Sequence, residues 1–568
     1  MSEMVLPGVY IEVRPEGLIV PGQISINTIG IVGTASRGPV GTPVFLGGIL
    51  DAREQFGDAD GWQGGTSDEL TLIRALELAY GHGATSVTAV RVASGGGAKA
   101  GQTLSSAGGE CVRLRALTPG TWGDSLQVNV APNSGDNDEN PFVLNEEHPG
   151  AATITLGRKP VVKSARNRVE YFVDATGVTH TLAVIYDDTP GGPSADQAKI
   201  NRANGTIDFG LTTDPQDKVT VSYMVAKTAP NPAPNQPPLP TAVKVTVRQL
   251  KGDDVVARDR FVAFDGDDLV AQLSQPGAST LVDAVARANS SEMPTPSAPG
   301  AWANFTGGDD GAAASDSDYR SGFDVLLNED AQIMVAAGRD ESFGDDLDSH
   351  CQTASTDAIK RDRIGVVGSS RTATLDTIRG HTLASDRIVF VAPGIKVGDD
   401  ALPGAYAAAA VAGLLAAFPP HVSLTNKTIR VDGLGTRFNS AQLIQLLDAR
   451  VLALEQRNGF RIVRGITTST NTAWQQITTR RIVDYAKYGV RSAAEPFIGL
   501  LNNARVRSAL RTSVNSFLAA MVEDEMLVSY DLTVGATRDE ERRGIARVTM
   551  VLRPTFSIDF IKVTMFLE

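Results

Sequence analysis

The chain has 568 residues, which corresponds to about three or four domains at roughly 150 residues each. Hydrophobic residues make up 42% of it and charged residues 21%, a composition that excludes wholesale disorder. The net charge is −13, divided as +5 over residues 436–568 and −18 over the rest. Such an acidic bulk argues against general nucleic-acid binding. No apolar run approaches roughly 18 residues, so we expect no membrane insertion and see no secretory signal.

Motifs that carry chemistry are missing from the sequence. Cys111 and Cys351 lie far apart without metal-site spacing, so we expect two buried thiols in a reducing compartment. The sequence contains no phosphate loop, dinucleotide fingerprint or nucleophile elbow. Acidic clusters at 265–268, 309–311 and 316–318 lack the ligand order of a calcium loop, and we expect solvated loops there. We therefore predict no catalytic residue, no cofactor and no metal, and hence not an enzyme.

The first thirty residues are expected to form an extended arm. Proline and glycine bound a short run at residues 9–13, which is too short between such breakers for a helix. The apolar members of this run are Val9, Tyr10, Ile11 and Val13. A strand-like segment without a local partner is suited to join the edge of another sheet.

Residues 31–106 carry the signals of an α/β core. A buried strand is predicted at Thr28–Gly33. A capping box at Thr66–Glu69 predicts a helix that begins near Thr66. The strand expected at Ser86–Val92 is apolar on both faces, which is typical of a strand in a covered parallel sheet.

Residues 107–304 alternate between short strands and turns, which favours an inserted, mostly β domain with a sandwich architecture. The expected strands are Cys111–Leu117, Leu126–Val130, Ala152–Leu156, Val169–Val173, Thr181–Tyr186, Thr206–Phe209 and Lys218–Val225. Six prolines within residues 229–240 predict a stiff, extended connector after these strands.

Residues 305–435 alternate between strand and helix signals, which indicates an α/β layer with parallel pairing. Strands are expected at Ala331–Ala336, Ile364–Val367 and Arg387–Val391, with helices near 343–360 and 373–381 and at Gly404–Ala417. The last of these helices is rich in alanine and begins directly after Pro403.

Residues 436–568 are expected to hold three amphipathic helices and terminal strands. The helices carry Leu443–Val451, Trp474–Tyr485 and Val506–Met521, and Asn439 caps the first. A strand is expected at Ala546–Leu552. Beyond it, two sets of alternating apolar residues follow with a one-residue slip in phase, namely Phe556, Ile558 and Phe560, then Ile561, Val563 and Met565. Such a slip turns the strand over or marks a bulge, and we expect this segment to be a second arm.

A series of short motifs runs in order along nearly the whole chain. They are Pro7-Gly8-Val9-Tyr10 with Glu12, Val32-Gly33-Thr34-Ala35, Arg37-Gly38-Pro39-Val40, Gln55-Phe56-Gly57, Leu76–Gly83 with Val90-Arg91-Val92, Pro119-Gly120-Thr121-Trp122-Gly123, Phe305–Gly311 with Asp318-Tyr319, Trp474 with Arg480-Arg481, and Arg553-Pro554. In this order they resemble the contractile tail sheath proteins of phages and related injection particles. Residues 130–300 match poorly, Asp124 replaces the usual asparagine, and the alanine-rich stretch at 401–417 replaces a proline-rich one.

The resemblance implies an α+β multidomain subunit with a mixed α/β sheath core, extended terminal β-arms and an inserted, mostly β outer domain. The expected divisions are an arm at 1–30, a first segment of the sheath core at 31–106, the inserted domain at 107–304, an α/β sheath domain at 305–435 and a C-terminal inner domain at 436–568. Sheath subunits stack as six-fold rings around an inner tube and contract once, without nucleotide hydrolysis. The implied location is a virion tail or injection particle assembled in the bacterial cytoplasm.

The implied partners are other copies of the chain, the inner tube protein, and the baseplate and tail terminator proteins. The arm residues named above would pair with neighbouring subunits. Arg505, Arg507 and Arg511 share one predicted helix in the basic C-terminal quarter, and we expect them to meet acidic groups on the tube. Two alternatives stay open: a surface-layer or capsid-like structural protein, and an α/β enzyme built on residues 305–430.

Overall fold

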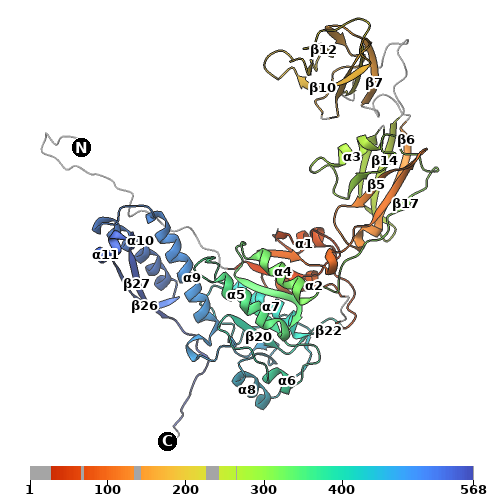
Figure 1. The fold of residues 1–568 in the computed structure, drawn as a ribbon. Helices are drawn as coiled ribbons and strands as arrows, with labels where there is room; N and C mark the ends of the chain where they lie inside the picture. Colours follow the sequence, from red (N-terminus) through yellow and green to blue (C-terminus); the bar gives the residue numbers. More distant parts are fainter. Residues whose placement is uncertain are drawn as a thin grey trace, which may run out of the picture. The chain divides into compact units, whose positions relative to one another are not determined.

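The computed structural model describes residues 27–65, 69–133, 142–164, 166–225, 242–263 and 265–566 (Figure 1). The chain divides into two compact units. The first combines the residues up to Gly96 with those from Asp310 onward, and the second is Gly97–Asp309. The inserted unit is therefore slightly longer at both ends than the expected range of 107–304.

An eight-stranded sheet forms the centre of the first unit, in the order β2-β3-β1-β18-β19-β20-β24-β25. The strands are β1 (Ile29–Gly33), β2 (Pro43–Leu46), β3 (Val87–Arg91), β18 (Ile333–Asp340), β19 (Ile364–Gly368), β20 (Ile388–Ala392), β24 (Leu452–Gln456) and β25 (Phe460–Ile462). The six inner strands run parallel and the two edge strands antiparallel. β1, β3, β19 and β20 are buried along their whole length, as expected for parallel strands covered on both faces.

Helices cover both faces of this sheet. One face packs against α1 (Ile49–Phe56), α2 (Leu72–Gly81) and α7 (Gly404–Ala417). The other packs against α4 (Asp316–Leu326), α5 (Gly344–Ala354), α6 (Leu375–Arg379) and α8 (Ser440–Asp448). The prediction for α7 is confirmed at both ends, and its small side chains allow close packing: a Cβ on Gly413 would lie 2.3 Å from the Ala79 carbonyl oxygen of α2.

The expected boundary between residues 435 and 436 falls inside this layer, because α8, β24 and β25 complete the sheet. The expected start of the first long helix is wrong. α2 begins at Leu72, while Thr66–Asp68 of the expected capping box lie outside the described residues. The Glu69 carboxylate instead accepts hydrogen bonds from the backbone N–H groups of Gln63 and Gly65, at 2.6 and 2.9 Å. It therefore organises the preceding loop instead of a helix.

Three of the sequence motifs meet at a buried arginine. Arg91 of β3 is fully buried and donates hydrogen bonds to the carbonyl oxygens of Gly38 and Asp310, at 2.8 and 3.1 Å. These three residues belong to three motifs that lie far apart in the sequence, so the sequence alone does not show this contact. Because a buried guanidinium must satisfy its donors, Arg91 fixes both loops against the sheet edge.

The second unit contains two β bodies with separate cores. The first consists of the sheets β15-β14-β6-β17 and β16-β5-β4 with helix α3, and the second is the sheet β7-β13-β9-β10-β11-β12-β8. All seven expected strands are present. The elements are β4 (Gly101–Ser106), β5 (Gly109–Ala116), β6 (Leu126–Asn133), β7 (Phe142–Pro149), β8 (Thr153–Thr155), β9 (Arg168–Val173), β10 (Val178–Tyr186), β11 (Gln197–Ile200), β12 (Thr206–Phe209), β13 (Lys218–Met224), β14 (Ala242–Lys251), β15 (Asp254–Ala263), α3 (Gly266–Leu273), β16 (Val282–Ala286) and β17 (Ala303–Asn304).

Two of the acidic clusters are helix starts, which corrects the expectation of solvated loops. Asp265 accepts a hydrogen bond from the backbone N–H of Asp268 and caps α3. Ser315 and Asp318 form a capping box at the start of α4. Carboxylates suit these positions because helix amide groups there lack intrahelical partners. Among the described residues, no group of three metal-binding side chains occurs.

The C-terminal part of the first unit consists of α9 (Ile477–Ala494), α10 (Ala504–Glu523), β26 (Leu527–Gly535), α11 (Arg538–Arg542) and β27 (Arg547–Pro554). The expected helices and the strand at β27 are confirmed, although Trp474 lies in a 3-10 turn before α9. β26 was not expected. Within the described ranges, no helix has the length and hydrophobicity needed to cross a bilayer.

Candidate assembly surfaces

β26 and β27 form a two-stranded antiparallel ribbon that packs one face on α10. Tyr530, Leu532 and Val534 of β26 face the helices, together with Val548 and Leu552 of β27. Among the described residues, neither outer edge of the ribbon pairs with another strand. Unpaired strand edges present rows of free backbone donors and acceptors and are ready templates for another chain. A ribbon of only two strands is also marginally stable alone.

The C-terminal segment after β27 is extended and belongs to none of the sheets through residue 566, where the described chain ends. All six apolar residues expected in the second arm are largely exposed, between 63% and 85%: Phe556, Ile558, Phe560, Ile561, Val563 and Met565. So many exposed apolar side chains on one short segment are typical of an interaction site. The expected strand at Phe556–Phe560 is extended but lacks a partner strand among the described residues, so its pairing remains a prediction. The first-arm residues Val9, Tyr10, Ile11 and Val13 lie outside the described residues.

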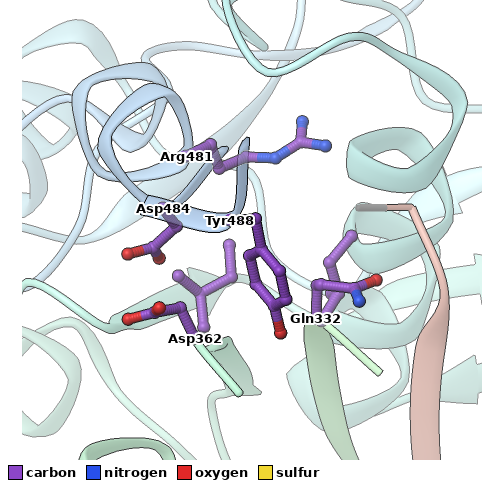
Figure 2. A pocket seen from close by; sticks show the side chains of 7 residues that line it. Gln332, Asp362, Arg481, Asp484 and Tyr488 are labelled. Atoms are coloured by element: carbon purple, nitrogen blue, oxygen red, sulfur yellow. The ribbon is translucent and has the colours of Figure 1, made fainter. Parts of the chain in front are cut away.

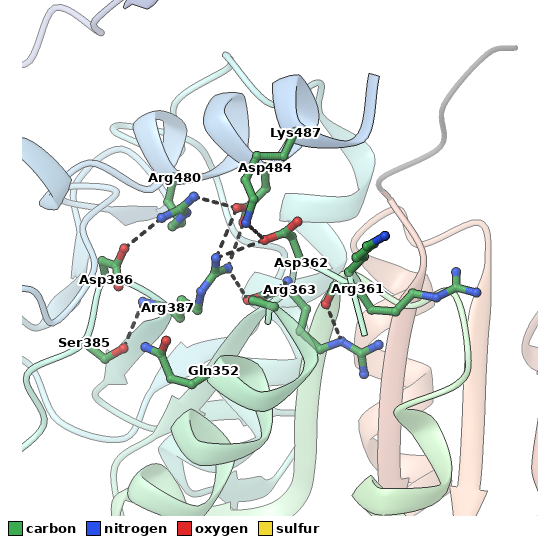
Figure 3. A network of polar contacts seen from close by, with 12 residues as sticks. Gln352, Arg361, Asp362, Arg363, Ser385, Asp386, Arg387, Arg480, Asp484 and Lys487 are labelled. Carbon is green, nitrogen blue, oxygen red and sulfur yellow. Dashed lines mark hydrogen bonds and ion pairs between the residues drawn. The ribbon is translucent and has the colours of Figure 1, made fainter. Parts of the chain in front are cut away.

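Buried charges connect α9 to the sheet. We call this set the α9 ion cluster, and its members are Asp362, Asp386, Arg387, Arg480, Asp484, Lys487 and Arg491. Figure 3 labels the first six of them. The Asp362 side chain is fully buried just before β19. It accepts hydrogen bonds from Arg387 at 3.3 Å, from Arg491 at 2.7 Å, and from Lys487. A carboxylate so deeply buried depends on such partners.

Asp484 of α9 is the second buried carboxylate of the cluster. Its carboxylate accepts hydrogen bonds from Nη1 of Arg387 at 3.0 Å and from Nη2 of Arg480 at 2.6 Å. Burial lowers the pKa of Arg387, but the attraction and hydrogen bonding of Asp484, together with the charge of Asp362, outweigh this effect and raise the pKa above its ordinary value. Arg480 also pairs with Asp386 at 2.9 Å and lies over the ring of Trp474, 4.5 Å from its centroid. The alternating charges match one another in this one arrangement of helix and sheet.

A small cavity lies between α9 and the sheet beside this cluster. Its volume is about 20 Å³, the size of one water molecule. Figure 2 shows Tyr488 pointing from α9 to a position between Asp362 and Gln332. Arg481, also in the lining, is buried, and this burial lowers its pKa to about 10. Its guanidinium donates to the side-chain oxygen of Asn27 at 3.0 Å, which fixes the start of the described chain to α9.

The three arginines expected to face the tube lie on α10 in different environments. Arg505 and Arg511 are exposed. Arg507 is half-buried and pairs with Glu541 of α11 at 2.9 Å and with the Asn502 side chain at 2.9 Å. The opposite, apolar side of α10 packs in the core as expected. Part of the charge of this trio is therefore matched within the chain.

The α9 ion cluster was missed by sequence reasoning. Its acidic members and their basic partners are separated by as many as 129 positions, and no spacing rule connects them. The pair Arg480-Arg481 after Trp474 was the available signal, because two adjacent arginines at the buried start of a helix require partners. β26 was detectable, since Tyr530, Leu532 and Val534 alternate with polar residues.

Comparison with known protein families finds two matching domain models. Residues 312–468 match the model of the phage tail sheath protein central domain, and residues 469–568 match that of the phage tail sheath C-terminal domain. The tail sheath protein of Bacillus phage SP01 is 24% identical over 569 residues, which span 93% of this chain and 90% of that protein.

Solved structures show the same fold. The crystal structure of a sheath tail protein from Desulfitobacterium hafniense aligns with a TM-score of 0.58 and 14% identity, over 96% of this chain and 100% of that one. One from Listeria innocua aligns with a TM-score of 0.57 and 12% identity, over 95% and 97%. Both domain models match in order over residues 312–568, and the Bacillus phage protein aligns along most of the chain, so this chain is similar to phage tail sheath proteins.

Proposed function

We propose that this chain is the subunit of a contractile sheath that polymerises as stacked six-fold rings around an inner tube. In this role it contracts to drive the tube through a target envelope, using a metastable assembly and no chemical step. One observation carries the proposal: within the described ranges, the β26–β27 ribbon has two unpaired edges and is followed by an exposed apolar segment. Such a subunit is suited to polymerise through its backbone.

The arms supply the connections in this proposal. The first arm (Val9, Tyr10, Ile11 and Val13) and the second (Phe556, Ile558, Phe560, Ile561, Val563 and Met565) would extend the ribbons of neighbouring subunits. Backbone hydrogen bonds across such a ribbon tolerate rotation of the rigid bodies that they join. The subunits therefore stay connected while the lattice changes from its extended to its contracted form.

The further partners are the inner tube protein along the sheath and the baseplate and tail terminator proteins at its ends, in a virion tail or injection particle assembled in the bacterial cytoplasm. The tube contact would use Arg505 and Arg511. Arg507 would contribute less of its charge, because it already pairs with Glu541. Individually weak, salt-screened contacts become decisive when they repeat at every subunit. Reversing the three arginines to glutamate should weaken tube-templated assembly and flatten its salt dependence; unchanged assembly and salt dependence would contradict the tube contact.

The unit at Gly97–Asp309 would lie on the outside, away from the tube. Its two ends are adjacent, since Ala98 and Asp309 exchange backbone hydrogen bonds, both at 3.0 Å. A short linker can therefore replace the unit without stretching the remaining chain. The excised protein should still polymerise, and a folded variant that no longer assembles would contradict the outer placement.

Electron microscopy of the purified protein tests the main proposal. Hollow helical tubes are expected from the full chain, whereas flat lattices would favour a surface-layer protein. Deletion of residues 1–20, or of residues 560–568, should leave a folded monomer that does not form tubes. Circular dichroism and size-exclusion chromatography establish folding in each case. Normal tubes from both deletions would refute the arm mechanism.

A further inference from the structure

The C-terminal segment has the reverse of the usual burial pattern. Phe556, Ile558 and Phe560 face solvent, at 63%, 80% and 82% exposure. The polar residues between them, Ser557 and Asp559, turn toward the protein, and only 7% of the Asp559 side chain is exposed. Carboxylates are rarely buried unless they are paired. The segment is therefore held against the first unit by its polar side, with its apolar side outward.

Asp559 has a complete set of partners. Its Oδ1 accepts hydrogen bonds from the hydroxyl groups of Thr425 at 3.1 Å and Ser557 at 3.0 Å. Its Oδ2 pairs with Nε of Arg464 at 2.8 Å and lies 3.4 Å from the side-chain nitrogen of Gln476. Hydrogen bonds that involve charged groups are the strong ones. One carboxylate thus fixes an otherwise exposed segment.

Two of the partners of Asp559 come from a different part of the chain than the strand that precedes it. Thr425 and Arg464 belong to the region matched by the central-domain model, whereas β27 belongs to the C-terminal domain. Arg464 also lies over the ring of Phe560, 5.5 Å from the centroid. Among the described residues of the arm, Phe560 is the last that contacts Arg464, and the residues from Ile561 to Phe566 are exposed.

We propose that Asp559 is a positioning residue that anchors the C-terminal arm to the α/β layer. This inference rests on the proposed sheath function and specifies where the free arm begins. With the anchor closed, eight residues follow Phe560 and reach at most about 29 Å; with it open, fourteen follow Pro554 and reach at most about 50 Å. The anchor therefore limits the neighbours that the arm can contact, and it holds the apolar face of residues 556–560 outward.

The anchor also explains the slip in the apolar pattern. Phe560 and Ile561 are consecutive, so the apolar side of the segment changes at the residue where the anchor ends. Before this point the polar side chains must face the protein to keep Asp559 buried. After it the chain is free of that requirement.

The test compares Asp559→Asn, which keeps the side-chain volume but removes the charge, with Asp531→Asn. Asp531 is 68% exposed and pairs with the exposed Arg553, so it is a matched control in the same domain. In a background that carries Cys111→Ala and Cys351→Ala, Val563→Cys carries a nitroxide spin label. Asp559→Asn should narrow the electron paramagnetic resonance lines of the labelled monomer, because the released arm then moves freely from Pro554 onward. Asp531→Asn should leave the spectrum unchanged.

Assembly provides the second readout. Asp559→Asn without the label should raise the protein concentration needed for sheath formation by tenfold or more, while leaving the thermal unfolding midpoint of the monomer unchanged. An unaltered spectrum and an unaltered assembly threshold would overturn the anchor. Deletion of residues 560–568 distinguishes this failure from failure of the arm proposal. If that deletion blocks assembly while Asp559→Asn does not affect it, the arm functions without the anchor; if neither change has an effect, the C-terminal arm takes no part in assembly and that half of the arm proposal is wrong.

Discussion

Replacing Asp362 by asparagine should destabilise the first unit strongly, because this residue connects two cations of α9 with one of the sheet. Its side chain is fully buried between Arg387, Lys487 and Arg491. The substitution preserves shape and one acceptor oxygen but removes the charge. Arg387 is only 6% exposed and would then depend on Asp484 alone, which it already shares with Arg480.

The expected cost is about 3–5 kcal/mol, the range found when one partner of a buried ion pair is removed and the remaining charge is left without compensation. Lys487 and Arg491 are 34% and 29% exposed and can turn toward water, which places the expectation near the lower end of the range. An exposed carboxylate provides the contrast. Asp376 is 80% exposed and pairs with Arg379 in the same helix, so Asp376→Asn should change stability by about 0.5 kcal/mol or less.

Labelling of Cys351 measures the effect without complete unfolding. This thiol is fully buried on α5, where the charges of Arg363 and Arg387 act on it. In a Cys111→Ala background, a thiol reagent reacts only when the first unit opens. A loss of about 3 kcal/mol accelerates labelling by about 150-fold, at one decade for each 1.4 kcal/mol. If Asp362→Asn accelerates labelling no more than Asp376→Asn does, the cluster does not stabilise the unit and the reasoning is wrong.

Three further predictions concern the described core. Gly413→Ala should cost about 1–3 kcal/mol or more in unfolding free energy, because its Cβ would meet the Ala79 carbonyl at 2.3 Å; Gly81→Ala, with open space around its Cβ, is the control, and equal urea midpoints would contradict the close packing. Burial, and to a smaller extent the positive charge of Arg363, lowers the pKa of His350 to about 3. Since the unfolded state alone gains this proton below pH 6.5, the first unit should lose about 2 kcal/mol between pH 8 and pH 5, and His350→Gln should abolish that loss in urea titrations. Burial raises the pKa of Cys111 to about 11, with help from Asp265, and that of Cys351 to about 12; neither should react at pH 8 in the folded protein, and single-cysteine variants should report the opening of the two units at different urea concentrations.

Elements with strong local signals were predictable, and those determined by distant contacts were not. Thirteen consecutive buried residues of α7 carry their own signal, since a run of small apolar residues after a proline has few alternatives. The start of α2 was wrong because Glu69 bonds to the loop before it. α3 was missed because Asp265 was interpreted as part of a solvated loop, although Leu269 and Leu273 follow it at helical spacing.

The candidate assembly surfaces also combine features that were predictable from the sequence with features that were not. The exposed apolar arm was predictable because its alternation continues past Pro554 with nothing local to pair with. The anchor at Asp559 was not, since its partners Thr425 and Arg464 are 134 and 95 positions away. Arg507 was expected to be available to a partner, but Glu541, which lies 34 positions further on, pairs with it. Polar contacts between remote segments leave no periodic pattern in a sequence.

The chemistry of the contacts differs between the inside of the first unit and its surface. α9 meets the sheet through buried charges that match in one arrangement, and a shifted helix would leave several of them unpaired at a high cost. Such an interface gives little net stability over an apolar one but strongly disfavours other arrangements. The arm presents apolar side chains and an extended backbone, which accept many partners and registers. In the proposed sheath, a subunit that keeps its shape while its neighbours rotate would combine rigid charge matching inside with permissive strand contacts between copies.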